Sequence, residues 1–466
     1  MSRTSTSAPH QEGHRDALAR PPSLRKVLGV ADGVALLVGI SIGAGIYTAP
    51  QIIAGYLGSF STILYLWLAV GVFALIGGFV YAELGTRLPE TGGEYVYISR
   101  CFGPFAGFMF GWSQLFIIRT STAAGLAMIC ADYLGYFVAL SSLARTLIAF
   151  GVLTILGVLN WIGVQWASAF QKVSTALKVA GLIALIVLGL VLSQGQSSVL
   201  SSQTIAPGAA RPLVSLAAAL MMIVFTYSGW DRVGYVAGEM KNPRKVVPMS
   251  LFIGMGTVIA VYNLTNYIYH RTLGLEGVRQ STILASDTAT RLMGPIGAGF
   301  VAVLVILSTT SSINGTMMAA PRAYYAMARD GLFFKWLDYI HPKFRTPARA
   351  ILVHCLWAGA IILIRRKFET IVAGMVFAVL IFYSLATVAL FKLRRNRIGE
   401  EHAYRIPLYP VLPAVYLAGL LGLLVFRGYF EWQRSLADLA FMATGLPFSL
   451  YWIHKNRRTK SGLPGP

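Results

Sequence analysis

Apolar residues dominate the chain in long, nearly uninterrupted runs, and polar residues gather in the short segments between them. A helix needs about 20 predominantly apolar residues to cross a bilayer. Several runs exceed one crossing, which predicts tilt or a helical extension beyond the membrane. We therefore predict an all-α integral membrane protein with twelve transmembrane helices, near residues 30–55, 59–86, 103–138, 144–163, 167–193, 212–240, 247–270, 291–328, 350–364, 369–393, 411–427 and 435–454.

The first run is interrupted by glycine at its centre. Gly39, Gly43 and Gly45 fall inside it, and Pro50 lies near its end. Glycine disfavours a helix, and an opened helix is tolerated in lipid where its freed backbone groups line a cavity. We predict that the helix opens over Ser41–Gly45 and that its N–H groups, at a positive helix end, hold an anion such as a carboxylate. The alternative is a close-packed glycine face.

The sixth run contains a similar interruption. Its centre, Phe225–Arg232, places a Ser-Gly step beside an Asp-Arg pair, which makes a poor helix within a membrane. Breaks in the first and sixth spans indicate two five-span repeats of inverted topology, with the site between them. The repeats would cover residues 27–193 and 212–398, and two further spans would lie within 405–454.

Charge indicates the orientation of the chain. Only 12% of residues are charged, but the formal net charge is +21. Most Lys and Arg residues fall in loops that share one side when the N-terminus is inside, as the positive-inside rule requires. We therefore predict a cell-membrane protein with two cytoplasmic tails, a disordered one at 1–26 and a second at 455–466. The basic charge orients the chain, so we expect no nucleic-acid partner.

Sequence patterns typical of enzymes are either absent or lack the structural context that they need. Gly39–Gly43 fits G-x-S-x-G, but that elbow needs a strand–turn–helix in an α/β sheet. Neither a phosphate-binding loop nor H-E-x-x-H occurs. Three scattered cysteines show no metal spacing. These observations argue against an ATP-driven pump and a zinc protease, and we expect no catalytic residues, no metal and no cofactor.

Several motifs, taken together and in order, resemble the amino acid–polyamine–organocation transporters, close to their L-type amino acid transporter branch. The resemblance covers roughly residues 28–425 and implies a LeuT-like fold and transport of amino acids or related amines by alternating access. The motifs that carry it are Gly39–Pro50, Tyr81–Tyr95, Tyr227–Asp231 with Gly238–Pro243, Ser312–Gly315 and Tyr404–Pro410.

The resemblance implies roles for the residues at the two breaks. In the first span, Ile42, Gly43, Ala44 and Gly45 would form part of the substrate site, and the N–H groups of the last three would bind the substrate carboxylate. In the sixth, carbonyls would bind the ammonium group, and two aromatic rings would close over the side chain; packing is the alternative for the rings. The carbonyls are those of Phe225, Thr226 and Ser228, and the rings are Tyr227 and Trp230.

Two basic residues, Lys178 and Arg119, lie deep inside predicted spans, where ionisable residues are functional by default. Lys178 lies about 11 residues into the fifth span, or ~17 Å deep. In the resembling branch a lysine here takes the place of a sodium ion, and Ser311 and Ser312 of the eighth span would lie beside it. Lys178 is a candidate for proton coupling or a permanently charged brace. Arg119 is either a selectivity residue or a structural arginine.

Asp231 leaves two interpretations open. It either pairs with its neighbour Arg232 or binds a cationic substrate side chain. Four further charges at the end of the second span are interpreted as a gate or a loop-anchoring network; they are Glu83, Arg87, Glu90 and Glu94.

The sequence departs from the resembling family at a partner site. Animal L-type light subunits carry a cysteine in the loop after the third span, which joins them to a heavy chain. The corresponding loop, Leu140–Arg145, has none, so we expect no disulfide-linked heavy chain. The expected partners are an amino acid, the lipid bilayer and, as a further candidate, protons.

The resulting hypothesis is a sodium-independent secondary transporter of amino acids that works as a proton symporter or an exchanger. One rival is a transporter of polyamines or other small organic cations. Another is a membrane enzyme, which would need a nucleophile–base pair that the sequence does not show. A third is a sensor that binds an amino acid without transporting it.

Overall fold

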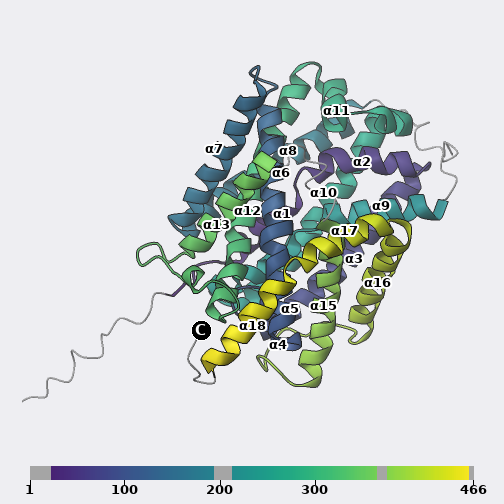
Figure 1. The fold of residues 1–466 in the computed structure, drawn as a ribbon. Helices are drawn as coiled ribbons and strands as arrows, with labels where there is room; N and C mark the ends of the chain where they lie inside the picture. The colour runs from purple at the N-terminus through teal and green to yellow at the C-terminus, as the bar shows by residue number, and fades with distance from the viewer. Residues whose placement is uncertain (1–22, 194–211, 365–374, 461–466) are drawn as a thin grey trace, which may run out of the picture.

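The computed structural model describes residues 23–193, 212–364 and 375–460. Over these ranges the chain forms a bundle of helices (Figure 1), and its one strand-like contact is an isolated bridge between Leu28 and Met240. Residues 1–22 of the first predicted tail and 461–466 of the second lie outside the described residues.

The helical segments follow the predicted spans closely. In chain order they are α1 Val30–Ser41, α2 Gly45–Tyr56, α3 Phe60–Arg87, α4 Glu94–Phe102, α5 Pro104–Ser113, the π-helical turn η1 Gln114–Ile118, α6 Arg119–Leu134, α7 Ser142–Trp161, α8 Val164–Leu192, α9 Pro212–Tyr227, the 3₁₀ segment η3 Trp230–Glu239, α10 Pro243–Gln280, α11 Leu284–Met293, α12 Ile296–Arg329, the 3₁₀ turn η4 Lys335–Leu337, α13 Ala348–Ile364, α15 Met375–Arg395, α16 Val411–Phe430, α17 Trp432–Ala443 and α18 Leu446–Lys460.

Ten helical stretches of the described chain are long and apolar enough to cross a membrane, or eleven if the bent pair α1 and α2 counts as one. The helix α13 is apolar but has 17 residues, below the roughly 20 that a perpendicular crossing takes. Many apolar helices of this length make the chain a multi-pass membrane protein. The count of twelve spans stays a prediction.

Some predicted spans differ from the helices that form, as two of them illustrate. The span near 247–270 is part of α10, which continues to Gln280 with a non-helical bend at Gly274 (φ 73°, ψ 170°). The span near 103–138 divides into α5, η1 and α6. Because glycine adopts a positive φ without steric penalty, Gly274 allows the bend in α10. Apolar periodicity alone does not predict this bend.

Small residues allow α1 to lie at the centre of the bundle (Figure 1). A Cβ atom on Gly39 would lie 2.0 Å from Gln171 Nε2 of α8, and one on Gly254 of α10 would lie 2.9 Å from Leu37 of α1. Such contacts are closer than real Cβ atoms permit, so the backbones approach because side chains are absent. The packing interpretation of the first-span glycines thus applies to Gly39.

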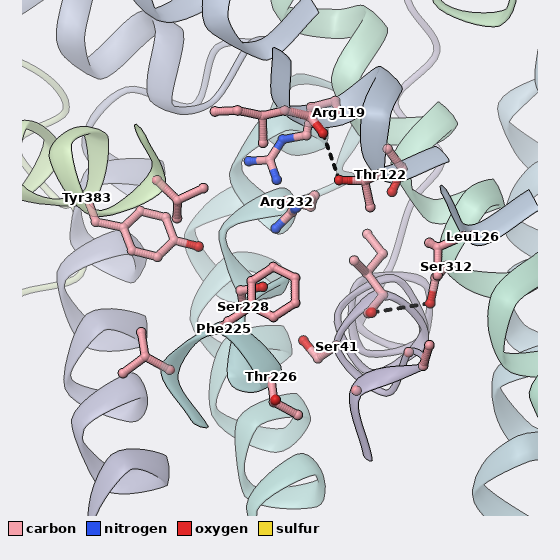
Figure 2. A pocket seen from close by; sticks show the side chains of 18 of the residues that line it. Ser41, Arg119, Thr122, Leu126, Phe225, Thr226, Ser228, Arg232, Ser312 and Tyr383 are labelled. Atoms are coloured by element: carbon pink, nitrogen blue, oxygen red, sulfur yellow. Dashed lines mark hydrogen bonds between the residues drawn. The ribbon is translucent and has the colours of Figure 1, made fainter. Parts of the chain in front are cut away.

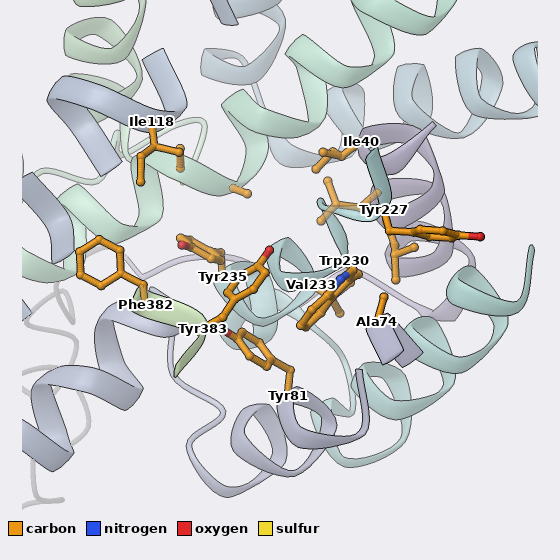
Figure 3. Close-up of a cluster of buried hydrophobic side chains, with 14 of the residues drawn as sticks. Ile40, Ala74, Tyr81, Ile118, Tyr227, Trp230, Val233, Tyr235, Phe382 and Tyr383 are labelled. Atoms are coloured by element: carbon orange, nitrogen blue, oxygen red, sulfur yellow. The ribbon is translucent and has the colours of Figure 1, made fainter. Parts of the chain in front are cut away.

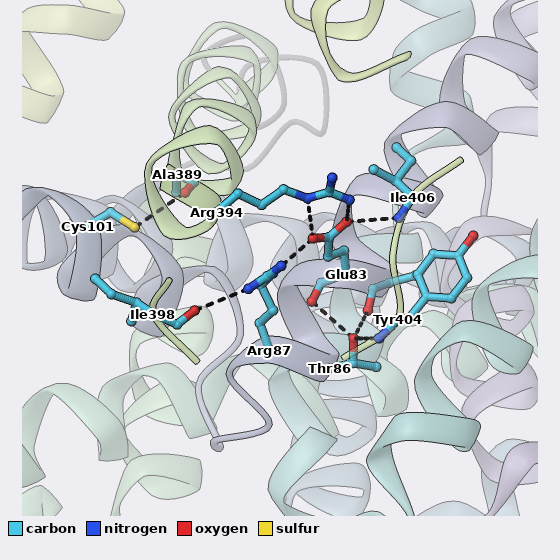
Figure 4. Close-up of polar contacts among 10 residues, drawn as sticks. Glu83, Thr86, Arg87, Cys101, Ala389, Arg394, Ile398, Tyr404 and Ile406 are labelled. Atoms are coloured by element: carbon cyan, nitrogen blue, oxygen red, sulfur yellow. Dashed lines mark hydrogen bonds and ion pairs between the residues drawn. The ribbon is translucent and has the colours of Figure 1, made fainter. Parts of the chain in front are cut away.

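A buried carboxylate anchors the loop after α15 to α3 (Figure 4). Glu83 accepts hydrogen bonds from Arg87 Nε (2.9 Å), from Arg394 Nε (2.7 Å) and Nη2 (2.5 Å), and from the backbone N–H of Ile406 (2.9 Å). These contacts confirm a loop-anchoring network for Glu83 and Arg87. Glu90 forms a separate, exposed pair with Arg100 (2.9 Å).

Candidate functional site

The first span opens where the sequence predicts. The helix α1 ends at Ser41, α2 begins at Gly45, and the two are bent by 43°. The N–H of Gly43 donates to the Ser41 carbonyl (2.8 Å). The first N–H groups of a helix have no acceptor within it. Of the three expected carboxylate donors, those of Ala44 and Gly45 therefore lie at a helix start, whereas that of Gly43 is already engaged.

The second break lies directly against the first. The helix α9 ends at Tyr227, Gly229 adopts φ 125°, and η3 follows as ten residues of 3₁₀ helix. Such a long 3₁₀ run is uncommon and marks a strained or functional segment. A Cβ on Gly229 would lie 2.8 Å from Ser41 Oγ, and one on Gly45 would lie 2.9 Å from Thr226 Cγ2. The two breaks therefore form one unit.

A tyrosine holds both breaks together. The Tyr262 hydroxyl lies within hydrogen-bond distance of the Ser41 carbonyl and of the Thr226 carbonyl (3.2 Å). Tyr262 is fully buried on α10. Carbonyls freed at the breaks thus find partners in the protein, as backbone at membrane depth requires.

A cavity of about 110 Å³ lies between the two breaks (Figure 2). One water needs about 10–15 Å³ on this scale, so the cavity holds roughly eight water-sized groups, enough for a small amino acid. The helices α1, α2, α6, α9, α12 and α15 and the segment η3 all contribute to its wall. The lining residues are Ile40, Ser41, Gly43, Ala44, Gly45, Ile118, Arg119, Thr122, Leu126, Val224, Phe225, Thr226, Ser228, Arg232, Ser312, Thr316, Val379, Leu380 and Tyr383.

Eight predicted site residues line this cavity. They are Gly43, Ala44, Gly45, Arg119, Phe225, Thr226, Ser228 and Ser312. Their roles toward a substrate stay predictions. The sequence did not identify the contributions of Thr122, Thr316 or Tyr383, because these residues belong to no motif at a break. Arg119 directly follows the π-helical turn η1, and such turns occur frequently at functional sites.

The two rings expected to cover the substrate pack elsewhere, which corrects their prediction. Tyr227 packs against Trp67 and Tyr262, with ring centroids 5.7 and 5.1 Å apart. Trp230 packs against Tyr81 (4.8 Å) and Tyr383 (5.2 Å), in the cluster shown in Figure 3. Neither lines the cavity. The aromatic-packing alternative therefore describes both rings.

Lys178 joins the opened first span to α8. Its Nζ atom donates to the Gly39 carbonyl (2.6 Å) and to the Ile42 carbonyl (2.7 Å). The side chain is fully buried. Ile42 is likewise buried and does not line the cavity, because its carbonyl faces Lys178. This corrects its placement in the substrate site.

Hydroxyl groups of α12 bind the same opened backbone. Ser308 Oγ donates to the Ile42 carbonyl (2.6 Å) and Ser312 Oγ to that of Gly39 (3.0 Å). Ser311 Oγ lies 3.5 Å from the Gly39 oxygen and 3.2 Å from Gln171 Nε2. An ammonium and three hydroxyls thus surround carbonyls that α1 leaves unpaired; that the lysine takes the place of a metal ion stays a prediction.

Asp231 is buried behind the cavity wall rather than exposed to it. One carboxylate oxygen accepts from Arg119 Nη2 (2.8 Å); the other accepts from the Tyr383 hydroxyl (2.9 Å) and from Arg232 Nη1. Asp231 does not line the cavity. Of its two interpretations, the geometry favours pairing with arginine over binding a cationic side chain.

Glu94 corrects the interpretation of the charges after the second span. It lies apart from Glu83 and is buried at the start of α4. Its carboxyl group accepts from the Tyr81 and Tyr235 hydroxyls, the latter at 2.9 Å, and lies 3.8 Å from Arg119 Nη2. Burial, followed by the charge of Asp231, raises the pKa of Glu94 to about 8. Two carboxyl groups and two arginines therefore form one cluster.

Stability is expected to fall as the pH rises through the range in which Glu94 ionises. Its folded pKa of about 8 exceeds the ordinary value of 4.5, so between these values the native state holds a proton that the unfolded state has released. The apparent melting temperature should therefore decline from pH 6 to pH 9, and Glu94→Gln should flatten this decline. The groups that face Glu94 are Tyr81 on α3, Tyr97 on α4, Arg119 on α6, Asp231 and Tyr235 on η3, Tyr383 on α15 and Tyr416 on α16.

Thermal unfolding in detergent at several pH values measures this slope. Glu90→Gln is the matched control, because Glu90 pairs with Arg100 at the surface. A wild-type slope that Glu94→Gln leaves unchanged would assign the pH dependence to another group.

In the described ranges, no three His, Cys, Asp or Glu side chains gather in a way that would hold a metal ion.

Known proteins resemble the chain over almost all its length. The family model described as amino acid permease matches residues 28–461. The chain is 32% identical to the serine/threonine exchanger SteT of Bacillus subtilis (strain 168), over 85% of this chain and 90% of that protein. It is 29% identical to the rat (Rattus norvegicus) b(0,+)-type amino acid transporter 1, over 95% and 91%. It is 30% identical to the human (Homo sapiens) cystine/glutamate transporter, over 93% and 87%.

Proposed function

The chain belongs to the amino acid permease family, and we propose that it is a secondary active transporter that carries amino acids across the cell membrane by alternating access. The observation that carries the proposal is the cavity between the two broken segments. Helix-start N–H groups lie on one side of it and the opened end of α9 on the other. Together these groups are suited to a molecule with both a carboxylate and an ammonium.

Sodium independence forms part of the proposal. A sodium site in such a fold would use backbone carbonyls of the opened first span and hydroxyls of α12. The Lys178 ammonium already contacts the Gly39 and Ile42 carbonyls, at 2.6 and 2.7 Å. A second cation at this position would be repelled. Proton symport or exchange of one amino acid for another then remains as the driving process.

The proposed topology is a LeuT-like fold of twelve spans with inverted repeats at residues 27–193 and 212–398. Two features support it: the interruptions in α1–α2 and α9–η3 occupy corresponding places in the two halves, and they meet in space. The positive-inside bias supports a cytoplasmic location for both termini.

The geometry argues against the organic-cation alternative. Asp231 motivated that alternative, and it is engaged by Arg119, Arg232 and Tyr383. A diamine without a carboxylate would also leave the N–H groups at the start of α2 unmatched. We therefore expect amino acids to be carried in preference to polyamines.

Uptake by the purified protein in liposomes tests the proposal. Labelled amino acids and a labelled polyamine would be offered with sodium or with choline outside. We expect amino acid uptake that is unchanged by choline, and stimulation either by amino acid loaded inside or by an inward proton gradient. Strong sodium stimulation would contradict sodium independence, and binding without uptake would identify a sensor.

A further inference from the structure

Two guanidinium groups border the cavity, whereas the carboxyl groups packed against them do not. Arg119 and Arg232 are lining residues that lie side by side in Figure 2. Both side chains are more than nine-tenths buried. Asp231 and Glu94 lie behind them and are absent from the lining. The wall that a substrate meets at this point is therefore positive.

Asp231 accepts hydrogen bonds from only one nitrogen of each guanidinium group. An arginine side chain carries five N–H donors. Arg232 contacts Asp231 through Nη1, and Arg119 contacts Asp231 through Nη2. The Nε atoms of both arginines are buried and have no hydrogen-bond partner among the described residues. These Nε atoms are closed to the cavity as well, so an acceptor in the cavity would meet the terminal guanidinium N–H groups that Asp231 leaves unengaged.

The position of these donors distinguishes them from the backbone site. The start of α2 supplies N–H groups for one anionic group, and Arg232 lies on η3, after the second break. One cavity therefore contains two sets of donors on different elements. An amino acid whose α-carboxylate occupies the first set would present its side chain to the second.

We propose that Arg232, supported by Arg119, forms a side-chain subsite that selects short amino acids ending in a hydrogen-bond acceptor or a carboxylate. This inference rests on the proposed transport function and names its substrate class. Asp231 acts as the counter-ion that holds both guanidiniums in place. Amino acids with a cationic side chain are disfavoured because their charge would face the two arginines, and apolar ones because they leave the donors unmatched.

Substrates of matched size give a direct test. Asparagine, aspartate, leucine and 2,4-diaminobutyrate have similar bulk and differ in the character of the side-chain end. In wild-type proteoliposomes we expect uptake of asparagine or aspartate to exceed that of leucine and of 2,4-diaminobutyrate by about tenfold or more. Equal uptake of all four, or preferred uptake of 2,4-diaminobutyrate, would overturn the inference.

Variants then assign the preference to Arg232. Arg232→Gln should reduce the asparagine-to-leucine ratio by about tenfold. Asp231 keeps its pairing with Arg119 in this variant, so no buried carboxylate is left unpaired. Arg232→Lys keeps the charge and loses the fork, so it should still disfavour 2,4-diaminobutyrate while its asparagine-to-leucine ratio falls. Arg100→Gln, at the surface pair with Glu90, is the matched control.

The outcomes separate this inference from the proposed function. If wild-type liposomes take up no amino acid at all, the transport proposal fails. If alanine enters but the four matched substrates enter equally, transport stands and the subsite is overturned. If the wild type discriminates and the ratio survives in every Arg232 variant, the selective group is another one.

Discussion

Replacing Lys178 by alanine is expected to reduce amino acid uptake by about a hundredfold or more. The ammonium makes two hydrogen bonds to carbonyls of the opened first span, at 2.6 and 2.7 Å. Hydrogen bonds to charged groups contribute about 1.5–3 kcal/mol each, so the pair accounts for about 3–6 kcal/mol. Each 1.4 kcal/mol is about a factor of ten. Uptake into proteoliposomes, normalised to reconstituted protein, measures the loss.

The same helix offers the control for this variant. Lys172 lies six positions earlier in α8 and pairs with Asp32 at 2.9 Å, with about half of its side chain exposed. Lys172→Ala should keep most of the activity. Size-exclusion profiles and melting temperatures show whether Lys178→Ala still folds. Near-normal uptake by a folded Lys178→Ala protein would show that transport does not require Lys178 to hold the opened first span.

Coupling is tested on the same preparation. If the Lys178 ammonium gains and loses a proton during transport, wild-type uptake should follow an imposed proton gradient, and a lysine that stays charged should give a flat response. A flat response would agree with Lys178 as a permanently charged brace and would contradict its role in proton coupling. Exchange against internal amino acid would then be the remaining driving process.

Sequence reasoning was most informative where the chain contains a local irregularity. Three glycines inside an apolar run imply an open or closely packed helix, and α1 shows both: Gly39 packs on α8, and the break follows Ser41. Lys178 was predicted from its depth and from the family resemblance. The deep lysine needed oxygen partners inside the bundle, and the opened carbonyls were the nearest ones that lacked partners.

The remainder of the site depends on how distant helices approach. Tyr227 and Trp230 stand beside the second break in sequence, but their rings turn away because other aromatic side chains offer packing partners there. Glu94 was grouped with Glu83 by sequence distance, whereas α4 packs across the bundle and buries it beside Arg119. Tyr383 comes from α15, more than 150 residues from Asp231, which it contacts. Such pairings are set by tertiary packing, and the pattern of apolar residues along the chain does not predict them.

Gly45→Val is expected to abolish substrate binding while the protein still inserts in the membrane. A Cβ atom at this position would lie 2.9 Å from Thr226 Cγ2 and 3.3 Å from Thr226 Oγ1. Valine would therefore occupy the space between the two breaks and push them apart. It would also keep a carboxylate from the N–H groups at the start of α2. The loss of about two charge-assisted hydrogen bonds predicts that the apparent Kd rises about a hundredfold or more.

A second glycine in the same helix supplies the matched control. Gly55 of α2 has no atom within 4 Å of the position a Cβ would take, so Gly55→Val should bind as the wild type does. Gly43 also has room, since the nearest neighbour of a Cβ atom there would be Ser312 Oγ at 3.4 Å, so the steric argument applies to Gly45 and not to Gly43. A bound ligand raises the melting temperature in proportion to the logarithm of its concentration over Kd. If Gly45→Val retains the wild-type shift in an amino acid titration, the carboxylate does not bind at the start of α2.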